Sequence, residues 1–436
     1  MPPRTTEPGP VDPTPGRWCV RGLKTVVLTT VGSTGDVMPH LALARALAAR
    51  GHRVRVASHA FHHGLFEAAG VEHVAVGPPL TLEAFNRAVD EVSRIPAPIK
   101  QFEQLVRRLF LVEPRRTLDE VSAVMADADL VVSQRFDYLG QVAAAQRGLP
   151  WVTVNLTPQL LFTMEAPVHP APPMGRVWTR FTWTTLEQMA VPLNRHVAQV
   201  LAALGAPKHP LDVVGARSPH LELVATSVHL SPVRADWPKT VEVTGPWFVP
   251  PTAYTPEPAL AEFLARYEAP VVVSFGSMGG ARDAGAAQAV LGALTRVGRP
   301  AVVQRGYSGL LGDRALPPHI LSVGPVPHHF LLGKAACVVH HAGVGTAAAV
   351  AAAGVPSVPV PHLFDQFYWA ARLHELGVAP KPLLRTALEA RALAQRIEAA
   401  LSPNLARRAE ALGHRVREER GVERAVAALE RLMGVG

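Results

Sequence analysis

The sequence predicts an α/β fold with two domains, each built on a parallel β-sheet. A chain of 436 residues is too long for one ordinary hydrophobic core and suits two or three domains. The β-branched run from Lys24 to Thr30 is followed by a glycine turn, an amphipathic helix pattern and a second strand pattern from Val54 to Ala57. Strand, helix and strand in this order require a parallel sheet. The same order begins again at Pro270 to Phe275, which predicts two Rossmann-like halves.

Glycines mark the ends of the elements in the first half. The turn at residues 32–36 (GSTGD) separates the first strand from its helix, and Gly51 ends that helix. Two further apolar runs, Leu130 to Val132 and Trp151 to Val154, predict additional strands of the same sheet.

Proline density locates the connection between the two halves. The segment from Pro232 to Pro258 is rich in proline, as expected of an inter-domain linker. We therefore expect a disordered tail at 1–22, a first Rossmann-like domain at 23–235, a linker at 236–258 and a second Rossmann-like domain at 259–412.

Composition indicates a soluble, cytoplasmic globular protein. Hydrophobic residues make up 48% of the chain and charged residues 18%. Cys19 and Cys337 lie in different contexts, so we expect no structural disulfide and a reducing compartment. The long charge-free run from Ala342 to Pro361 is alanine-rich and broken by glycine and proline, which argues against a membrane span. Residues 1–18 lack the apolar segment of a signal peptide.

The net charge of +8 raises the question of an acidic partner. Arginines are dispersed along predicted helices, and no nucleic-acid-binding motif is present, so solvated helix faces are favoured over a nucleic-acid surface. Peripheral contact with an anionic membrane stays open.

The stretch from Val338 to Gln366 is the most informative for function. A buried strand leads through HHAGVGT (residues 340–346) into an alanine-rich helix pattern that Gly354 and Pro356 stop. Free N–H groups and the positive dipole end at such a helix start suit an anion such as a diphosphate. After the next strand, Asp365 and Gln366 combine a carboxylate with an amide, a pair that suits sugar hydroxyls.

These motifs resemble the nucleotide-sugar signature of the family 1 glycosyltransferases. Bacterial members of that family read much like HHGGAGT, then AGVP, then DQ, at the same spacing. The resemblance extends to GSTGDVMPHLALARALAARGHRV near the start, ADWPKTVEVTGPWF in the middle and VVVSFGSM opening the second half. Among the branches, the chain is similar to bacterial rhamnosyl, sterol and antibiotic glycosyltransferases.

The resemblance implies a GT-B architecture. In that family an N-terminal domain binds the acceptor, a C-terminal domain binds the nucleotide-sugar, and the active site lies in the cleft between them. The last helix, expected at 413–436, packs back on the N-terminal domain. We assign the proline-rich loop from Thr157 to Pro173 to acceptor binding, because loops at the carboxyl ends of strands line such a cleft.

Asp36 is the expected catalytic base. It follows a glycine turn at the start of the first helix, and its place in GSTGDVMP matches where the family puts this base. A helix N-cap is the competing interpretation, and both roles can coexist. Relatives with a histidine base often have an acidic residue that orients it, and this chain has Gln134 at that position. If the base is Asp36, a second carboxylate there would raise the pKa of Asp36 instead of orienting it. Asp137 is a weaker candidate helper.

The donor site is expected in the second half. Neither the tryptophan that stacks on the base in plant relatives nor the ribose-binding glutamate is present; Ala349 stands at the latter position, so both UDP- and dTDP-sugars fit. Val326 and His328 occupy the base-binding stretch. The diphosphate is expected to contact Ser277, His341, Gly343, Val344, Gly345 and Thr346, and the sugar Asp365 and Gln366.

We expect no metal and no cofactor. The histidine pairs at 62–63 and 328–329 lack further ligands at zinc spacing. Asp127 and Asp129 form a DxD pattern, but they precede a strand in the half that does not bind the donor.

The leading hypothesis is therefore an inverting, metal-independent glycosyltransferase. Its partners would be a UDP- or dTDP-sugar and a lipophilic acceptor, namely a natural-product aglycone, lipid hydroxy acid or sterol, with the protein a monomer or homodimer. The alternatives are a non-catalytic auxiliary subunit and a UDP-sugar 2-epimerase, which would need more carboxylates in the cleft. A nicotinamide dehydrogenase is weaker, because the first glycine turn is not GxGxxG.

Overall fold

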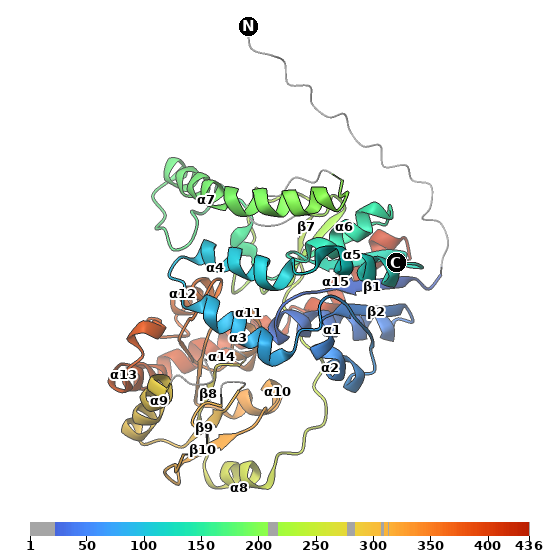
Figure 1. Ribbon diagram of the computed structural model, residues 1–436. Helices are drawn as coiled ribbons and strands as arrows, with labels where there is room; N and C mark the ends of the chain where they lie inside the picture. Colours follow the sequence, from blue (N-terminus) through green and yellow to red (C-terminus); the bar gives the residue numbers. More distant parts are fainter. Residues whose placement is uncertain (1–21, 208–216, 277–283, 307–308, 313, 436) are drawn as a thin grey trace.

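Two parallel sheets form two domains, and the predicted α/β class is confirmed. The computed structural model describes residues 22–207, 217–276, 284–306, 309–312 and 314–435. One sheet has seven strands in the order β3-β2-β1-β4-β5-β6-β7, and the other has five in the order β10-β9-β8-β11-β12. The first domain lies in the upper part of Figure 1 and the second in the lower part. The predicted tail lies almost wholly outside the described residues.

In the first sheet, β1 and β4 are central neighbours although they are distant in sequence. Val26 pairs with Leu130 and Thr29 with Ser133. The strand order changes direction between these two strands, and such a switch point opens a crevice at the carboxyl ends. The strands are β1 (Thr25–Thr29), β2 (Arg53–Ser58), β3 (Glu72–Ala75), β4 (Leu130–Gln134), β5 (Trp151–Asn155), β6 (Leu221–Val224) and β7 (Val241–Val243).

Helices cover both faces of this sheet. Every residue of β4 and β5 is buried, because a doubly covered parallel strand has no solvent face. The helical segments are α1 (Thr34–Ala49), η1 (Ala60–His62), α2 (His63–Ala68), α3 (Leu82–Ser93), α4 (Pro98–Leu105), η2 (Val106–Phe110), α5 (Pro114–Val124), α6 (Tyr138–Gln146), η3 (Pro158–Leu160) and α7 (Arg176–Ala203).

The second sheet repeats the arrangement with β8 and β11 at its centre. His340 pairs with Ser274 on one side and with Pro359 on the other. Its strands are β8 (Val271–Ser274), β9 (Ala301–Gln304), β10 (Ile320–Val323), β11 (Cys337–His340) and β12 (Ser357–Pro359). The helical segments are α8 (Pro258–Arg266), α9 (Ala284–Val297), α10 (His328–Leu331), η4 (Leu332–Lys334), α11 (Val344–Ala353), α12 (Gln366–Glu375), η5 (Arg385–Ala387), α13 (Ala390–Ala400) and α14 (Pro403–Arg417).

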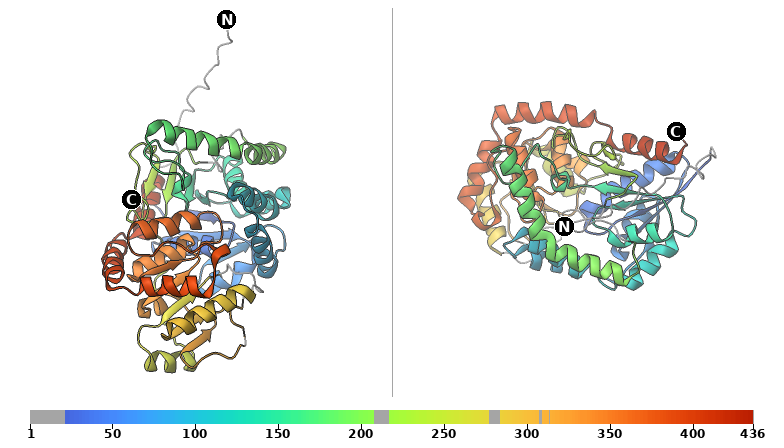
Figure 2. Two further views of the ribbon diagram at one scale, coloured as in Figure 1. Left: turned by 90° about the vertical axis from the view of Figure 1, so that its left-hand side faces the viewer. Right: turned by 90° about the horizontal axis from the view of Figure 1, so that it is seen from above.

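The last helix, α15 (Gly421–Met433), joins the core of the first domain. Its apolar residues Ala425, Val426 and Leu429 pack in one cluster with β1 and α1, and the helix lies beside them in Figures 1 and 2. A turn with Arg420 at φ +49° separates α15 from α14. The chain thus crosses between domains twice and ties them together.

Side chains also join the two domains near the cleft. The Phe364 ring stacks on Phe102 with centroids 4.9 Å apart and planes 13° from parallel. The hydroxyl groups of Tyr368 and Ser231 lie 2.8 Å apart. No helix within the described ranges is both long and apolar enough to cross a membrane.

Candidate active site

The turn between β1 and α1 places Asp36 at the carboxyl end of the first sheet. Ser33 is the N-cap of α1, and Asp36 is the third helical residue of a capping box. Asp36 Oδ2 accepts hydrogen bonds from the Ser33 N–H (2.8 Å) and hydroxyl (3.0 Å). Gly32 has φ +117°, and a Cβ there would lie 2.5 Å from Asp36 Oδ2. Only glycine leaves room for this carboxylate.

Gln134 holds the other carboxylate oxygen from the end of β4. Its Nε2 donates to Asp36 Oδ1 at 3.0 Å. Its Oε1 accepts from the Val31 N–H (3.0 Å) and the Thr30 hydroxyl (3.2 Å), which fixes the orientation of the amide. Burial raises the pKa of Asp36, while the bonds from Ser33 and Gln134 oppose that rise. The result is a desolvated carboxylate in one fixed orientation.

The loop after β11 presents the start of α11 to the cleft. Ala342 takes φ +63°, which turns the chain into the N-cap Gly343. The first helical hydrogen bond runs from Ala347 N–H to the Gly343 carbonyl, so the N–H groups of residues 344–346 have no partner within the helix. Gly345 is exposed. This helix start can therefore bind an anion.

The His341 ring lies against the same helix start. A Cβ on Gly343 would be 2.5 Å from His341 Nε2, and one on Gly276 would be 3.2 Å from its Cε1. The two glycines thus leave the space that the ring occupies. Burial, followed by the neighbouring histidines, lowers the pKa of His341 well below its usual value. His341 Nδ1 has no hydrogen-bond partner within the described residues, so a neutral ring has a donor or acceptor to offer a ligand.

His340 and the two residues expected to bind the nucleotide base, Val326 and His328, lie close to His341 or in the core beneath it. His340 is fully buried, and its Nδ1 accepts the Ala342 N–H at 3.1 Å, which supports the turn. His328 begins α10, close enough to His340 and His341 to lower their pKa values. The Val326 side chain lies in the core, and its carbonyl accepts a bond from Gln304. Ser277 lies outside the described residues.

Asp365 and Gln366 follow β12 through Phe364, which has φ +50°. Asp365 Oδ2 accepts from the Trp369 indole N–H at 3.0 Å. Gln366 Oε1 accepts the N–H groups of His362 (2.8 Å) and Leu363 (3.2 Å). The Gln366 oxygen therefore shapes the loop, and its NH₂ group is the part left to contact a sugar.

The two predicted carboxylates, one from each domain, lie close enough for the charge of Asp36 to act on Asp365. Burial and then the charge of Asp36 raise the pKa of Asp365 to about 7. Since Asp36 comes from the first domain and Asp365 from the second, the structure places the expected base and the expected sugar ligand within electrostatic range of each other.

Other polar candidates have structural partners. Asp137 caps α6 by accepting the Gly140 N–H at 3.1 Å. Asp127 pairs with Arg55 and Arg53, and Asp129 accepts the Thr25 N–H at 2.8 Å. Among the residues that the structure describes, no group of three or more His, Cys, Asp or Glu is placed to hold a metal ion.

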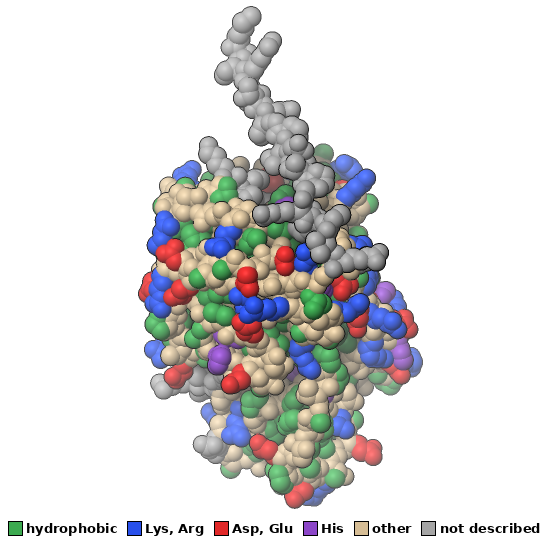
Figure 3. Space-filling model, turned by 90° about the vertical axis from the view of Figure 1, so that its right-hand side faces the viewer, with side chains coloured by type: hydrophobic (Ala, Val, Ile, Leu, Met, Phe, Trp, Pro, Cys, Tyr) green, Lys and Arg blue, Asp and Glu red, His purple; other side chains and the backbone are tan. Residues whose placement is uncertain are grey.

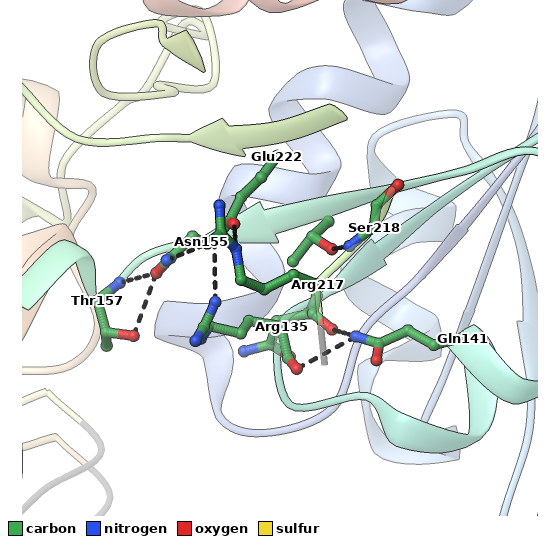
Figure 4. Close-up of polar contacts among 9 residues, drawn as sticks. Arg135, Gln141, Asn155, Thr157, Arg217, Ser218 and Glu222 are labelled. Atoms are coloured by element: carbon green, nitrogen blue, oxygen red, sulfur yellow. Dashed lines mark hydrogen bonds and ion pairs between the residues drawn. The ribbon is translucent and has the colours of Figure 1, made fainter. Parts of the chain in front are cut away.

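Sequence reasoning missed a buried ionic network beneath the proline-rich loop (Figure 4). Glu222 on β6 accepts from Arg135 (2.9 Å) and Asn155 (2.8 Å) through Oε1, and from Arg217 (2.6 Å) through Oε2. Asn155 Oδ1 accepts the Thr157 N–H at 2.7 Å. The network joins the carboxyl ends of β4 and β5 to the second residue of β6 and to the start of the loop. The sequence feature that could have indicated this network is the set of polar residues that directly follow or interrupt the apolar runs of the strands.

Charges on the surface are mixed. On the face shown in Figure 3, Lys and Arg side chains lie interspersed with Asp and Glu. That face carries no continuous basic surface of the kind that binds nucleic acid.

Comparisons with known proteins agree with this geometry. Residues 26–158 match the glycosyltransferase family 28 N-terminal domain, and residues 288–423 match the erythromycin biosynthesis protein CIII-like C-terminal domain. The chain is 32% identical to the O-mycaminosyltylonolide 6-deoxyallosyltransferase of Streptomyces fradiae over 93% of this chain and 96% of that protein. It is 28% identical to a sterol 3-beta-glucosyltransferase of Arabidopsis thaliana over 93% of this chain and 68% of that protein. The structure of glycosyltransferase VinC in complex with dTDP superposes with a TM-score of 0.66 at 21% identity, covering 94% of this chain and 100% of that one.

The pKa of Asp365 predicts a pH-dependent stability of the ligand-free protein. A carboxyl group whose pKa is raised to about 7 in the folded state stabilises the fold fully below its unfolded pKa, roughly 3.9, and this contribution is lost as pH rises through about 7. Asp365→Asn removes the titration. In thermal melts from pH 5 to pH 8, the Asn variant should therefore gain stability relative to wild type as pH rises.

Asp127→Asn is the control for this experiment, because Arg55 lowers the pKa of Asp127. Its titration therefore lies below the range of the melts, and its difference from wild type should be small and nearly constant from pH 5 to pH 8. If the stability difference between wild type and the Asp365→Asn variant is also constant across this range, the raised pKa of Asp365 is contradicted.

Proposed function

Because this chain belongs to the family 1 glycosyltransferases of GT-B fold, we propose that it transfers a sugar from a UDP- or dTDP-sugar to a hydroxyl group of a lipophilic small molecule, with inversion and without a metal ion. The observation that carries the proposal is the pair of carboxylates from opposite domains, Asp36 and Asp365, beside the open start of α11.

Two relatives support the acceptor class. One is named for transfer to O-mycaminosyltylonolide and the other for transfer to a sterol 3β-hydroxyl. Both acceptors are apolar frameworks with hydroxyl groups. We propose a natural-product aglycone of this kind, with sterols and lipid hydroxy acids as members of the same chemical class. VinC was solved with dTDP, and this supports dTDP-sugars as donors alongside UDP-sugars.

Asp36 would act as the general base. The acceptor hydroxyl gives its proton to Asp36 as its oxygen attacks the anomeric carbon, and the bond from that carbon to the diphosphate oxygen breaks on the opposite side. The configuration at the anomeric carbon is therefore inverted. Burial makes Asp36 a stronger base than an exposed carboxylate. Asp36 Oδ2 accepts two hydrogen bonds from Ser33, whereas Oδ1 accepts one from Gln134 and keeps a lone pair for the acceptor proton.

The leaving diphosphate would be stabilised by α11. The N–H groups of Val344, Gly345 and Thr346 and the helix dipole meet the growing negative charge. His341 adds one N–H from a neutral ring. These groups would stabilise the negative charge of the diphosphate, as a bound cation does in metal-dependent enzymes. They therefore support a metal-independent and cofactor-free reaction.

The outward face of α7 supports a peripheral membrane contact. Surface helices usually carry polar residues outward, but here Val177 (88% exposed), Phe181 (58%) and Met189 (50%) point to solvent. Arg176 and Arg195 are exposed on the same helix. We propose that this face rests on an anionic bilayer, where a lipophilic acceptor would partition. A cytoplasmic location is part of the same proposal.

Asp36→Asn tests the base. Gln134 is fixed as a donor toward Asp36 and the Ser33 N–H donates to the other oxygen, so the Asn amide meets a donor at one of the two sites. We expect a loss of about 1 kcal/mol in unfolding free energy, unchanged donor affinity and a fall in transfer rate of about a hundredfold to ten-thousandfold. Calorimetry measures the unfolding free energy and the donor affinity, and steady-state kinetics measures the transfer rate. A wild-type rate would exclude Asp36 as the base.

His341→Ala should reduce transfer by about a hundredfold, the usual cost of losing one donor to a developing anion. Stabilisation by dTDP or UDP in thermal melts should fall as well, while the melting point of the ligand-free protein changes less. A folded variant with the wild-type turnover number would remove His341 from the mechanism.

Transfer should survive removal of divalent cations. We expect the same initial rate in EDTA and in added Mg²⁺ or Mn²⁺, because α11 and His341 meet the diphosphate charge. Loss of activity in EDTA that Mn²⁺ restores would refute the metal-independent proposal and return attention to Asp127 and Asp129.

The α7 face should bind vesicles that contain phosphatidylserine more strongly than vesicles of phosphatidylcholine alone. The double variant Val177→Ser, Phe181→Ser should lose this binding in co-sedimentation, while its dTDP affinity is unchanged. The matched control is Thr185→Ser, which changes an already polar exposed position on the same helix. If the double variant alters only the oligomeric state, the face is an interface between copies of this chain.

A further inference from the structure

The helix α12 is anchored to both domains. On the side of the first domain, the Tyr368 and Ser231 hydroxyl groups lie 2.8 Å apart, and Arg372 Nε donates to the Leu230 carbonyl at 2.9 Å. On the side of the second domain, Trp369 is 1% exposed and packs in one cluster with residues of α11 and α14. The helix lies where the two domains meet (Figure 1). Its position therefore depends on the first domain as well as on the second.

The proline-rich loop that we assign to acceptor binding reaches this helix. His169 of the loop meets the Tyr368 ring edge to face, with centroids 5.7 Å apart and planes 87° from parallel. The preceding residue, Val168, packs against the same apolar cluster as Phe364. Phe364 directly precedes Asp365, and Tyr368 lies about one helical turn beyond it. The loop thus contacts the helix that begins just after the proposed sugar ligand.

Trp369 extends this contact to the carboxylate. The Tyr368 and Trp369 rings meet edge to face with centroids 5.0 Å apart and planes 75° from parallel. The Trp369 indole N–H donates to Asp365 Oδ2 at 3.0 Å. A buried indole in a close-packed cluster does not shift without its neighbours. A continuous series of side-chain contacts therefore runs from His169 in the first domain to Asp365 in the second.

The two parts of the donor are assigned to different helices. The diphosphate is assigned to the start of α11, whereas the sugar is assigned to Asp365, the N-cap residue of α12, and to Gln366. A change in the position of α12 would therefore alter binding of the sugar more than binding of the free nucleotide. The contact from the acceptor loop thus acts on one part of the donor site.

We propose that Tyr368 is a positioning residue that couples the acceptor loop to the sugar ligand Asp365, so that an acceptor bound against the loop strengthens binding of the donor sugar. The inference rests on the proposed transferase function for the identity of both ligands. An acceptor that orders the loop fixes His169 against Tyr368, which lowers the cost of ordering α12 when the sugar binds. Because coupling between two sites is reciprocal, the bound sugar strengthens binding of the acceptor by the same factor.

The Trp369 indole N–H signal in ¹H–¹⁵N NMR spectra tests the coupling on the ligand-free protein. Among the signals of the seven tryptophans, it is the one absent from the spectrum of Trp369→Phe. His169→Ala removes the ring from Tyr368 and should shift or broaden this signal, whereas His169→Phe keeps an aromatic contact and should leave it near its wild-type position. Met174→Ala is the matched control, because Met174 directly follows the loop and is 68% exposed. The control should leave the signal unchanged.

A double-mutant cycle tests whether the coupling passes through Tyr368. Tyr368→Leu removes the ring between His169 and Trp369. In this background, His169→Ala should cause no further change in the Trp369 signal. If Tyr368→Leu does not fold, the His169 series still decides. A Trp369 signal that is unchanged in His169→Ala, or that responds equally with and without the Tyr368 ring, would overturn the proposal.

Calorimetry measures the consequence for the donor sugar. The probes are dTDP, UDP, dTDP-glucose and UDP-glucose, and the quantity compared is the affinity for the nucleotide-sugar divided by the affinity for its free nucleotide. This ratio should fall about 2- to 10-fold in His169→Ala, the effect of one aromatic contact, and should return in His169→Phe. The affinity for the free nucleotide should be unchanged. Equal losses for both ligands would indicate a general structural role and contradict the proposal.

These measurements separate the inference from the proposed function. If the nucleotides bind and sugar is transferred to O-mycaminosyltylonolide, but the Trp369 signal ignores His169, the coupling fails and the transferase function stands. If the Trp369 signal responds through Tyr368 but no nucleotide binds, the function fails while the contact between loop and Asp365 remains. In transfer assays, His169→Ala should raise KM for the nucleotide-sugar more than it lowers kcat, and the reverse pattern would also count against the coupling.

Discussion

The hydrogen bond from Gln134 to Asp36 is the interaction on which the proposed catalytic arrangement depends. It joins the first helix to the end of β4, and it exists because β1 and β4 are neighbours at the switch point of the sheet. The Gln134 amide is itself fixed by the Thr30 hydroxyl and the Val31 N–H. The turn after β1 therefore holds the Asp36 carboxylate indirectly, through Gln134. An amide in this position orients the carboxylate without adding a second negative charge. The Asp36 carboxylate is thereby oriented without an acidic residue at the end of β4.

A second carboxylate, Asp365, lies near Asp36 in the other domain. Burial together with the charge of Asp36 raises the pKa of Asp365. Its position is set by Phe364, whose left-handed backbone is compensated by stacking on Phe102 in the first domain. A sugar that donates hydroxyl hydrogens to Asp365 would favour the charged form and remove the conflict. The domain contact, the left-handed backbone at Phe364 and the proposed sugar ligand Asp365 are therefore adjacent in the chain.

Sequence patterns predicted the central strands and the helix start at the HHAGVGT loop, because these depend on local periodicity and on the topology of parallel sheets. They did not predict that the Gln366 oxygen would be used inside its own loop, nor the stacking of Phe364 on Phe102, since both depend on tertiary contacts. Asp36 was expected as a possible N-cap, whereas Ser33 occupies that position and Asp36 completes the capping box. The 28-residue α7 was also missed, because its exposed apolar residues weaken the helical pattern.

Gln134 and Arg135 show how one strand end serves two purposes. Successive side chains point to opposite sides of a strand, so Gln134 reaches Asp36 while Arg135 reaches Glu222. Gln141 on α6 binds both of their carbonyl groups and fixes this crossing point. A buried ion pair adds little net stability compared with apolar packing, but removal of one partner leaves a costly charge. Its contribution is geometric: the network sets the start of the proline-rich loop at Thr157 relative to the residue that holds the base. The start of the proline-rich loop and the proposed base Asp36 are thus held in fixed relation through Gln134, the last residue of β4, and Arg135, which follows it.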